Sequence, residues 1–95
     1  MVHVVAQLTI HDRERHQRYT AGFMAVLRQQ GGRLLASNEA PEVVEDSRER
    51  DKVVLLAFAD RSAYEARASS EAHQRIARDR IAATEGPVLL VRGIG

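Results

Sequence analysis

Two short apolar runs, residues 53–58 (VVLLAF) and 88–91 (VLLV), constrain the fold of this chain more than any other feature. Side chains of a β-strand point alternately to the two faces of its sheet, so a strand that is apolar at every position needs cover on both faces. A chain of 95 residues has enough length outside its strands to cover one face with helices, and little is left for the other. We therefore expect a second copy of the protein to cover the remaining face.

The composition excludes several classes of protein. Hydrophobic residues make up 44% of the chain and charged residues 28%, which is typical of a folded domain and excludes a disordered one. The net charge of +1 gives no electrostatic reason to expect nucleic acid or an anionic membrane as a partner. Cysteine is absent, which excludes disulfides, thiol catalysis and cysteine metal sites.

The sequence also carries no signal for a membrane. No stretch approaches the ~20 apolar residues that a membrane-spanning helix needs. The residues after Met1 lack the basic segment and the long apolar segment of a secretion signal. We expect a cytoplasmic protein with one domain over residues 1–95.

Periodicity and capping residues predict the secondary structure. Apolar residues alternate along the first strand, and they recur at helical spacing after Asp12, a residue type that caps helices. Pro41 cannot donate a backbone hydrogen bond, so the element that contains it should be an edge strand or carry a bulge. The expected elements are a strand over 3–10, a helix from 12 to 31, a strand over 33–37 that resumes at 42–45, a charged turn over 46–51, a strand over 52–59, helices over 60–69 and 70–84, and a strand from 88.

The order βαββαβ predicts an α+β fold of the ferredoxin-like type, a four-stranded antiparallel sheet with both helices on one face. We expect the uncovered face to carry Val5, Leu55 and Leu90. Leaving it in water would forfeit ~25 cal/mol for each Å² of apolar area. Two such sheets packed face to face would form a homodimeric α/β barrel.

Several stretches together carry a family pattern: Thr9 to Tyr19, Gly31-Gly32-Arg33, Val43-Val44-Glu45, residues 53–58, and Ser70 to Ile76 followed by Arg80. With these stretches the chain resembles, almost end to end, the domain-of-unknown-function family 1330 in the dimeric α/β-barrel superfamily. The resemblance implies a homodimer with a cleft between helix and sheet and chemistry that is mostly unassigned. The sequence departs from the family pattern at His73, Arg67 and Asp46.

His73 is the candidate acid–base residue, because histidine can exchange a proton near neutral pH. Arg80 lies two helical turns later on roughly the same face and is the candidate anchor for a carboxylate or an enolate-like oxygen. Both residues have a structural alternative: His73 could pack at the helix start, and Arg80 could pair with Glu45 or with an acid of the second chain.

Further candidates lie on the first strand and helix. Gln7 shares a strand face with His3 and Thr9 and could contact a ligand, although polar groups satisfied at a dimer interface explain the same pattern. Tyr19 is expected in the core, with a hydroxyl that could reach the cleft. His11 and His16 are five residues apart, a spacing that does not favour a shared metal ion, and we expect neither a metal nor a cofactor.

Three functions remain as hypotheses. The first is a homodimeric protein that binds a small anionic or aromatic metabolite, either as a binder or as a cofactor-independent enzyme. The second is a monooxygenase of the antibiotic-biosynthesis type. The third is a structural or regulatory dimer without a ligand, which requires a filled space between sheet and helices.

Overall fold

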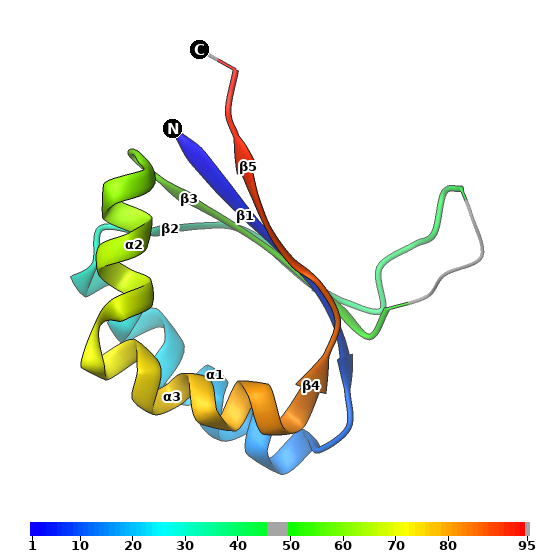
Figure 1. The fold of residues 1–95 in the computed structure, drawn as a ribbon. Coiled ribbons are helices and arrows are strands. Elements are labelled where there is room, and N and C mark those ends of the chain that lie inside the picture. The colour runs from blue at the N-terminus through cyan, green and yellow to red at the C-terminus, as the bar shows by residue number, and fades with distance from the viewer. Residues whose placement is uncertain (46–49, 95) are drawn as a thin grey trace.

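The computed structural model describes residues 1–45 and 50–94 and places all of their helices on one face of a twisted antiparallel sheet (Figure 1). None of these helices is long and apolar enough to cross a membrane. The elements are β1 (Val2–Ile10), α1 (Arg13–Gln29), β2 (Arg33–Glu39), β3 (Lys52–Phe58), α2 (Arg61–Ser69), α3 (Glu71–Ala83), β4 (Thr84–Glu85) and β5 (Val88–Arg92).

The strand order confirms the predicted α+β, ferredoxin-like fold. The sheet runs β2-β3-β1, and β4 and β5 both pair with the far edge of β1. Strands β2 and β3 form the expected antiparallel hairpin, and β2 is the expected edge strand. The second helical segment consists of α2 and α3, which meet at Ser70.

Helix starts follow the capping residues that the sequence contains. Asp12 accepts a hydrogen bond from the backbone N–H of Arg15, and Asp60 accepts one from Ala63. Ser70 caps α3 in the same way through the backbone N–H of His73. Each cap satisfies a backbone donor that the first turn of a helix leaves free.

The pairing register decides which side chains face the helices. Val4 lies opposite Leu56 on β3 and Leu90 on β5, and all three belong to the core or pack against it. The expectation that Leu90 faces away from the helices is therefore wrong, because Leu90 pairs with Val4, whose side chain faces the helices, and Leu89 pairs with Val5. The outer face instead carries Val5 and its neighbours across the sheet, Leu55 and Leu89.

The second strand runs to Glu39, beyond the expected first segment of 33–37, and the expected second segment is absent. It does not resume at residues 42–45, because Ala40 adopts a positive φ of 55° and turns the chain out of the sheet just before Pro41. A register shift between Leu34 and Ala36 adds a bulge within β2. The expected charged turn over residues 46–51 falls largely on 46–49, which lie outside the described residues.

The core forms where α1 packs on the sheet. Tyr19, Phe23 and Leu27 of α1 are buried against Leu56 and Phe58 of β3. Burial of side chains of this size contributes about 1.5–3 kcal/mol each.

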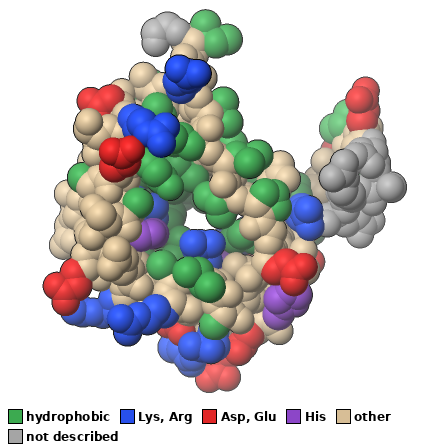
Figure 2. Space-filling model, in the orientation of Figure 1, with side chains coloured by type: hydrophobic (Ala, Val, Ile, Leu, Met, Phe, Trp, Pro, Cys, Tyr) green, Lys and Arg blue, Asp and Glu red, His purple; other side chains and the backbone are tan. Residues whose placement is uncertain are grey.

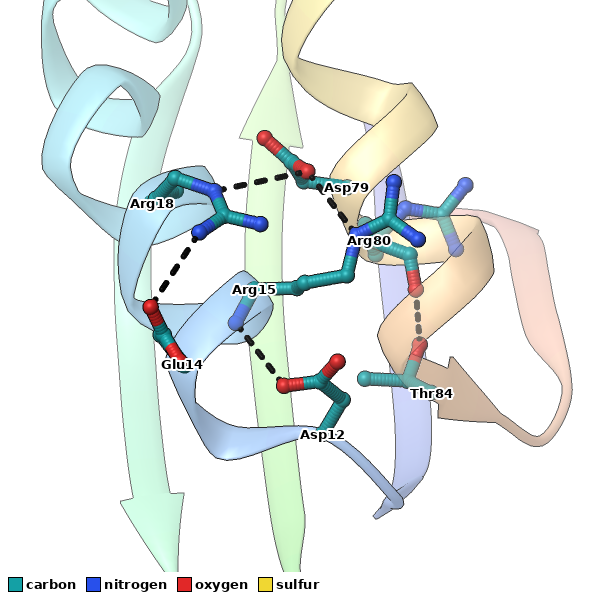
Figure 3. Close-up of polar contacts among 7 residues, drawn as sticks. All are labelled: Asp12, Glu14, Arg15, Arg18, Asp79, Arg80 and Thr84. Carbon is teal, nitrogen blue, oxygen red and sulfur yellow. Dashed lines mark hydrogen bonds and ion pairs between the residues drawn. The ribbon is translucent and has the colours of Figure 1, made fainter.

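The helices are also tied to each other through Asp79 of α3. Its Oδ1 lies 3.3 Å from Nε of Arg15 and 3.8 Å from Nε of Arg18 on α1 (Figure 3). These ion pairs join α3 to α1.

A glycine separates β4 from β5. Gly86 has a φ of 136°, which L side chains rarely adopt, and a Cβ there would collide with the carbonyl oxygen of Gln7. The backbone of Gln7 then donates to the carbonyl of Pro87 at 3.0 Å, so pairing with β1 resumes directly after the break. The close approach allows one edge of β1 to carry two strands.

Gly86→Ala should lower the free energy of unfolding by about 2–4 kcal/mol, because it adds backbone strain to a steric collision. Gly31→Ala is the matched control, since Gly31 also has a positive φ (72°) but open space around its Cβ position. The control should cost about 1 kcal/mol. Urea unfolding of both variants measures the difference, and equal losses would contradict the role of the close approach.

Candidate functional site

A cavity of about 260 Å³ lies between the inner face of the sheet and the helices. Figure 2 shows this hollow, with mainly hydrophobic side chains around it and basic side chains inside. Its floor is apolar and comes from alternate residues of β1 and β3, including Val4, Ala6, Val54 and Leu56. The polar side chains that line it include His16, Tyr19, Lys52, Arg67, His73 and Arg80.

The charge of the lining is one-sided. Lys52, Arg67 and Arg80 are cationic, and no carboxylate of the described residues lines the cavity. Burial of a cation without a partner costs several kcal/mol, so proteins rarely retain one without a counter-charge. The described lining therefore carries an excess of positive charge.

Arg67 is the most deeply buried of these cations. Its side chain is 4% exposed, and its Nε has no hydrogen-bond partner among the described residues. The guanidinium lies over the rings of Phe23 and Phe58, 5.5 and 5.8 Å from their centroids. Burial lowers the pKa of Arg67, against the opposing effect of Tyr19. Aromatic faces stabilise the cation in part without occupying Nε, and Tyr19 forms a hydrogen bond with the guanidinium.

Helix α2 places Arg67 in the cavity through its helical spacing. Ala63 and Tyr64 lie four and three residues earlier on the same helix face, and both pack against the core. Arg67 continues this inward face, although its neighbours in the sequence are polar or small. The same periodicity could have predicted its position from the sequence.

His73 sits in the first turn of α3, and its ring Nδ1 is buried without a hydrogen-bond partner among the described residues. Burial lowers its pKa from 6.5 to about 4, and the positive charges of Arg67 and Arg80 act in the same direction. The imidazole is therefore neutral at pH 7. An anion bound beside the two arginines would cancel part of this effect and raise the pKa of His73.

Arg80 lies on α3 two helical turns after His73 and also lines the cavity. Its neighbour Asp79 points to α1, whereas Figure 3 shows no ion pair to the Arg80 guanidinium. The described residues contain no ion pair between Arg80 and Glu45, which was one of the two structural alternatives; the other, an acid of a second chain, stays a prediction. Tyr19 completes this end of the cavity. Its burial raises the pKa of its hydroxyl, so the hydroxyl stays protonated.

A second polar group lies elsewhere in the lining and was not predicted as part of a site. Nζ of Lys52 is 3.1 Å from Nε2 of His16, a residue that is 4% exposed. Burial lowers the pKa of both residues, and the positive charge of Lys52 lowers that of His16 further. The sequence signal was the phase of β3, because Lys52 alternates with Val54 and Leu56 and so points to the helices.

The structure therefore brings His73, Arg80 and Tyr19 together around one cavity. Gln7 does not line it. Val4, Ala6 and Leu8 do, so the alternation of β1 sends Gln7 to the outer face of the sheet with His3. Of the two histidines weighed for metal binding, His16 lines the cavity and His11 pairs with Glu85 at 2.9 Å.

Comparison with protein-family models assigns the chain to a family. The model of the family described as "Domain of unknown function (DUF1330)" matches residues 1–94. A comparison with curated protein sequences gives no match.

Solved structures share the fold at low sequence identity. A protein of unknown function from Rhodopseudomonas palustris has a TM-score of 0.85 and 12% identity, over 99% of this chain and 82% of that one. A dimeric ferredoxin-like protein of unknown function from Jannaschia sp. CCS1 has a TM-score of 0.71 and 18% identity, over 97% and 98%. SnoaB from Streptomyces nogalater, described as a cofactor-independent oxygenase, has a TM-score of 0.66 and 14% identity, over 99% and 93%.

The lowered pKa of His73 predicts a specific acid sensitivity. Between the ordinary value of 6.5 and the folded value of about 4, the unfolded chain binds more protons at this residue than the folded chain. The contribution of neutral His73 to the free energy of unfolding is thus fully present above pH 6.5 and is lost as the pH falls towards 4. His73→Gln should reduce this loss in urea unfolding experiments, whereas the exposed control His11→Gln should not. Parallel pH profiles for wild type and His73→Gln would contradict the burial of this imidazole.

Proposed function

Because this chain belongs to the DUF1330 family, whose description assigns no activity, we propose its function from the geometry of the cavity. The protein is a homodimer that binds a small anionic metabolite with an apolar or aromatic body between its sheet and its helices. The site residues are Arg67 and Arg80 as anchors, Tyr19 as a hydroxyl donor and His73 as the acid–base group.

The observation that carries this proposal is the burial of Arg67 without a carboxylate. An anionic group would supply the missing counter-charge and accept hydrogen bonds from the guanidinium. Arg80 lines the same cavity and supplies a second cation. The apolar floor suits the body of the ligand, since pockets of this kind use a few polar groups to orient a mostly apolar molecule.

His73 extends the proposal from binding to catalysis. A neutral imidazole beside two arginines can take a proton from the ligand, while the arginines stabilise the negative charge that forms. This chemistry needs no cofactor. The ligand-free hypothesis requires a filled space and satisfied polar groups, and the cavity and the unpartnered atoms of Arg67 and His73 argue against it.

The homodimer is proposed from the outer face of the sheet. Val5 and Leu55 lie opposite each other there, beside Leu89 and Val91, whose side chains are 47% and 46% exposed. A second sheet packed on this face would remove its apolar area from water. The description of the Jannaschia protein as dimeric supports the same arrangement.

A cofactor-independent oxygenase is the second candidate. Its support is the structural similarity to SnoaB together with a neutral base beside two cations, which could deprotonate a phenol. Oxygen consumption with a panel of polycyclic phenols separates this candidate from plain binding. Consumption that depends on His73 would favour the oxygenase.

Arg67→Met should weaken the binding of benzoate, used as a probe anion, by roughly tenfold or more, because it removes a charged hydrogen-bond donor. The same variant without ligand should be more stable by about 1 kcal/mol or more, since an unpaired buried charge is replaced by an apolar side chain. Calorimetric titration and urea unfolding measure the two effects.

Arg75→Met is the matched control, because Arg75 lies on α3 with its side chain 74% exposed. It should change neither quantity appreciably. Unaltered benzoate binding in Arg67→Met would remove the main support for the anion site.

Leu55→Asp should convert the protein to a monomer in sedimentation velocity, because it places a charge in the centre of the proposed interface. Ile81→Asp tests the helical side, where Ile81 is 67% exposed, and should leave the dimer intact. A wild-type protein that sediments as a folded monomer at micromolar concentration would refute the dimer.

A further inference from the structure

The second polar group of the cavity, the pair formed by Lys52 and His16, can only donate hydrogen bonds to a ligand. An ammonium group has no acceptor, so its contact with Nε2 of His16 makes that nitrogen the acceptor. The imidazole proton then resides on Nδ1, which is buried and has no partner among the described residues. The pair thus offers a ligand the remaining N–H donors and the positive charge of Lys52, and no acceptor.

This pair is separated from Arg67 along α1. His16, Tyr19 and Phe23 follow one another on the same face, with ring centroids 5.9 Å apart for the first two and 5.5 Å for the second two. Seven residues of helix between His16 and Phe23 correspond to a rise of ~10 Å. Arg67 lies over Phe23, so the two basic groups occupy the two ends of this aromatic row.

Neighbouring acids do not cancel the charge at the Lys52 end. Glu39 lies opposite Lys52 in the sheet register, and its carboxylate also contacts Arg13 at 3.8 Å. Glu39 opposes the lowering of the pKa of Lys52 but is shared with the exposed Arg13, so it offsets the charge of Lys52 only in part. At the other end, Arg67 and Arg80 are cationic, while His73 and Tyr19 are neutral at pH 7.

We propose that the ligand is an elongated dianion with an apolar middle, whose first anionic group binds Arg67 and Arg80 and whose second binds Lys52 and His16. This inference rests on the proposed function, because it assigns the substrate class of the same cavity. The apolar floor between the two ends then contacts the middle of the molecule, and Tyr19 flanks it. A monoanion bound at the arginines would leave the ammonium of Lys52 without an anionic acceptor.

Two pairs of probes of matched shape test the second anionic group. Terephthalate and 4-methylbenzoate differ by a carboxylate in place of a methyl group, and adipate and hexanoate form a flexible pair. Calorimetric titration of the wild type should show that at least one dianion binds roughly tenfold tighter than its matched monoanion, as expected for one added charged hydrogen bond.

Lys52→Met should abolish this preference without weakening the monoanion, whereas Lys52→Arg, which keeps the charge, should retain much of it. His16→Phe should reduce the preference and provides an independent variant if Lys52→Met fails to fold. Arg67→Met should weaken both members of each pair. Far-ultraviolet circular dichroism and urea unfolding establish that each variant is folded.

The outcomes separate this inference from the proposed function. If the monoanions bind through Arg67 and the dianions bind no more tightly, the second site is refuted and the anion-binding function stands. A preference for dianions that survives in Lys52→Met and His16→Phe would also refute the assignment. If none of the four probes binds at millimolar concentration, both the dianion and the general anion site are overturned.

Discussion

Strand β1 is hydrogen-bonded along both edges, and this double pairing determines the rest of the structure. With β3 on one edge and β5 on the other, the register cannot slip by one residue without moving every inner side chain to the outer face. The inner residues of three strands are thereby aligned under the helices. They form both the core and the floor of the cavity, and Val4 and Leu56 belong to both.

At the cavity the helices place polar side chains over an apolar part of the sheet. Arg67, His73 and Arg80 each place nitrogen atoms above an apolar floor, and the described residues supply no acid to neutralise them. Such an arrangement lowers the stability of the empty protein, a cost that is typical of binding and catalytic sites. The aromatic rings under Arg67 limit this cost, since they interact favourably with a cation without using its hydrogen-bond donors.

The fold could be predicted almost completely from local signals, because apolar runs, caps and turn residues each act over a few positions. Asp12, Asp60 and Ser70 began the helices where expected. The site was predicted only in part. His73 was a candidate because histidine can exchange a proton near neutral pH, and Arg80 because it lies two helical turns after His73. Arg67 lies among polar and small residues and resembles a solvent-exposed position. Lys52 has the same appearance at the start of its strand. The periodicity of each segment places both residues on its inward face. How deeply a charged side chain is covered there depends on how the helices sit over the sheet, which is a tertiary property.

Lys52 has a practical consequence because it is the single lysine of the chain. Apart from the terminal amine, the only aliphatic amine available for acylation or reductive alkylation lies in the cavity wall. Its lowered pKa leaves a larger fraction of the reactive free base at neutral pH than an ordinary lysine has. Amine-directed reagents would therefore label the cavity itself, and protection of this one position would report occupancy in a mass spectrum without any assay of turnover.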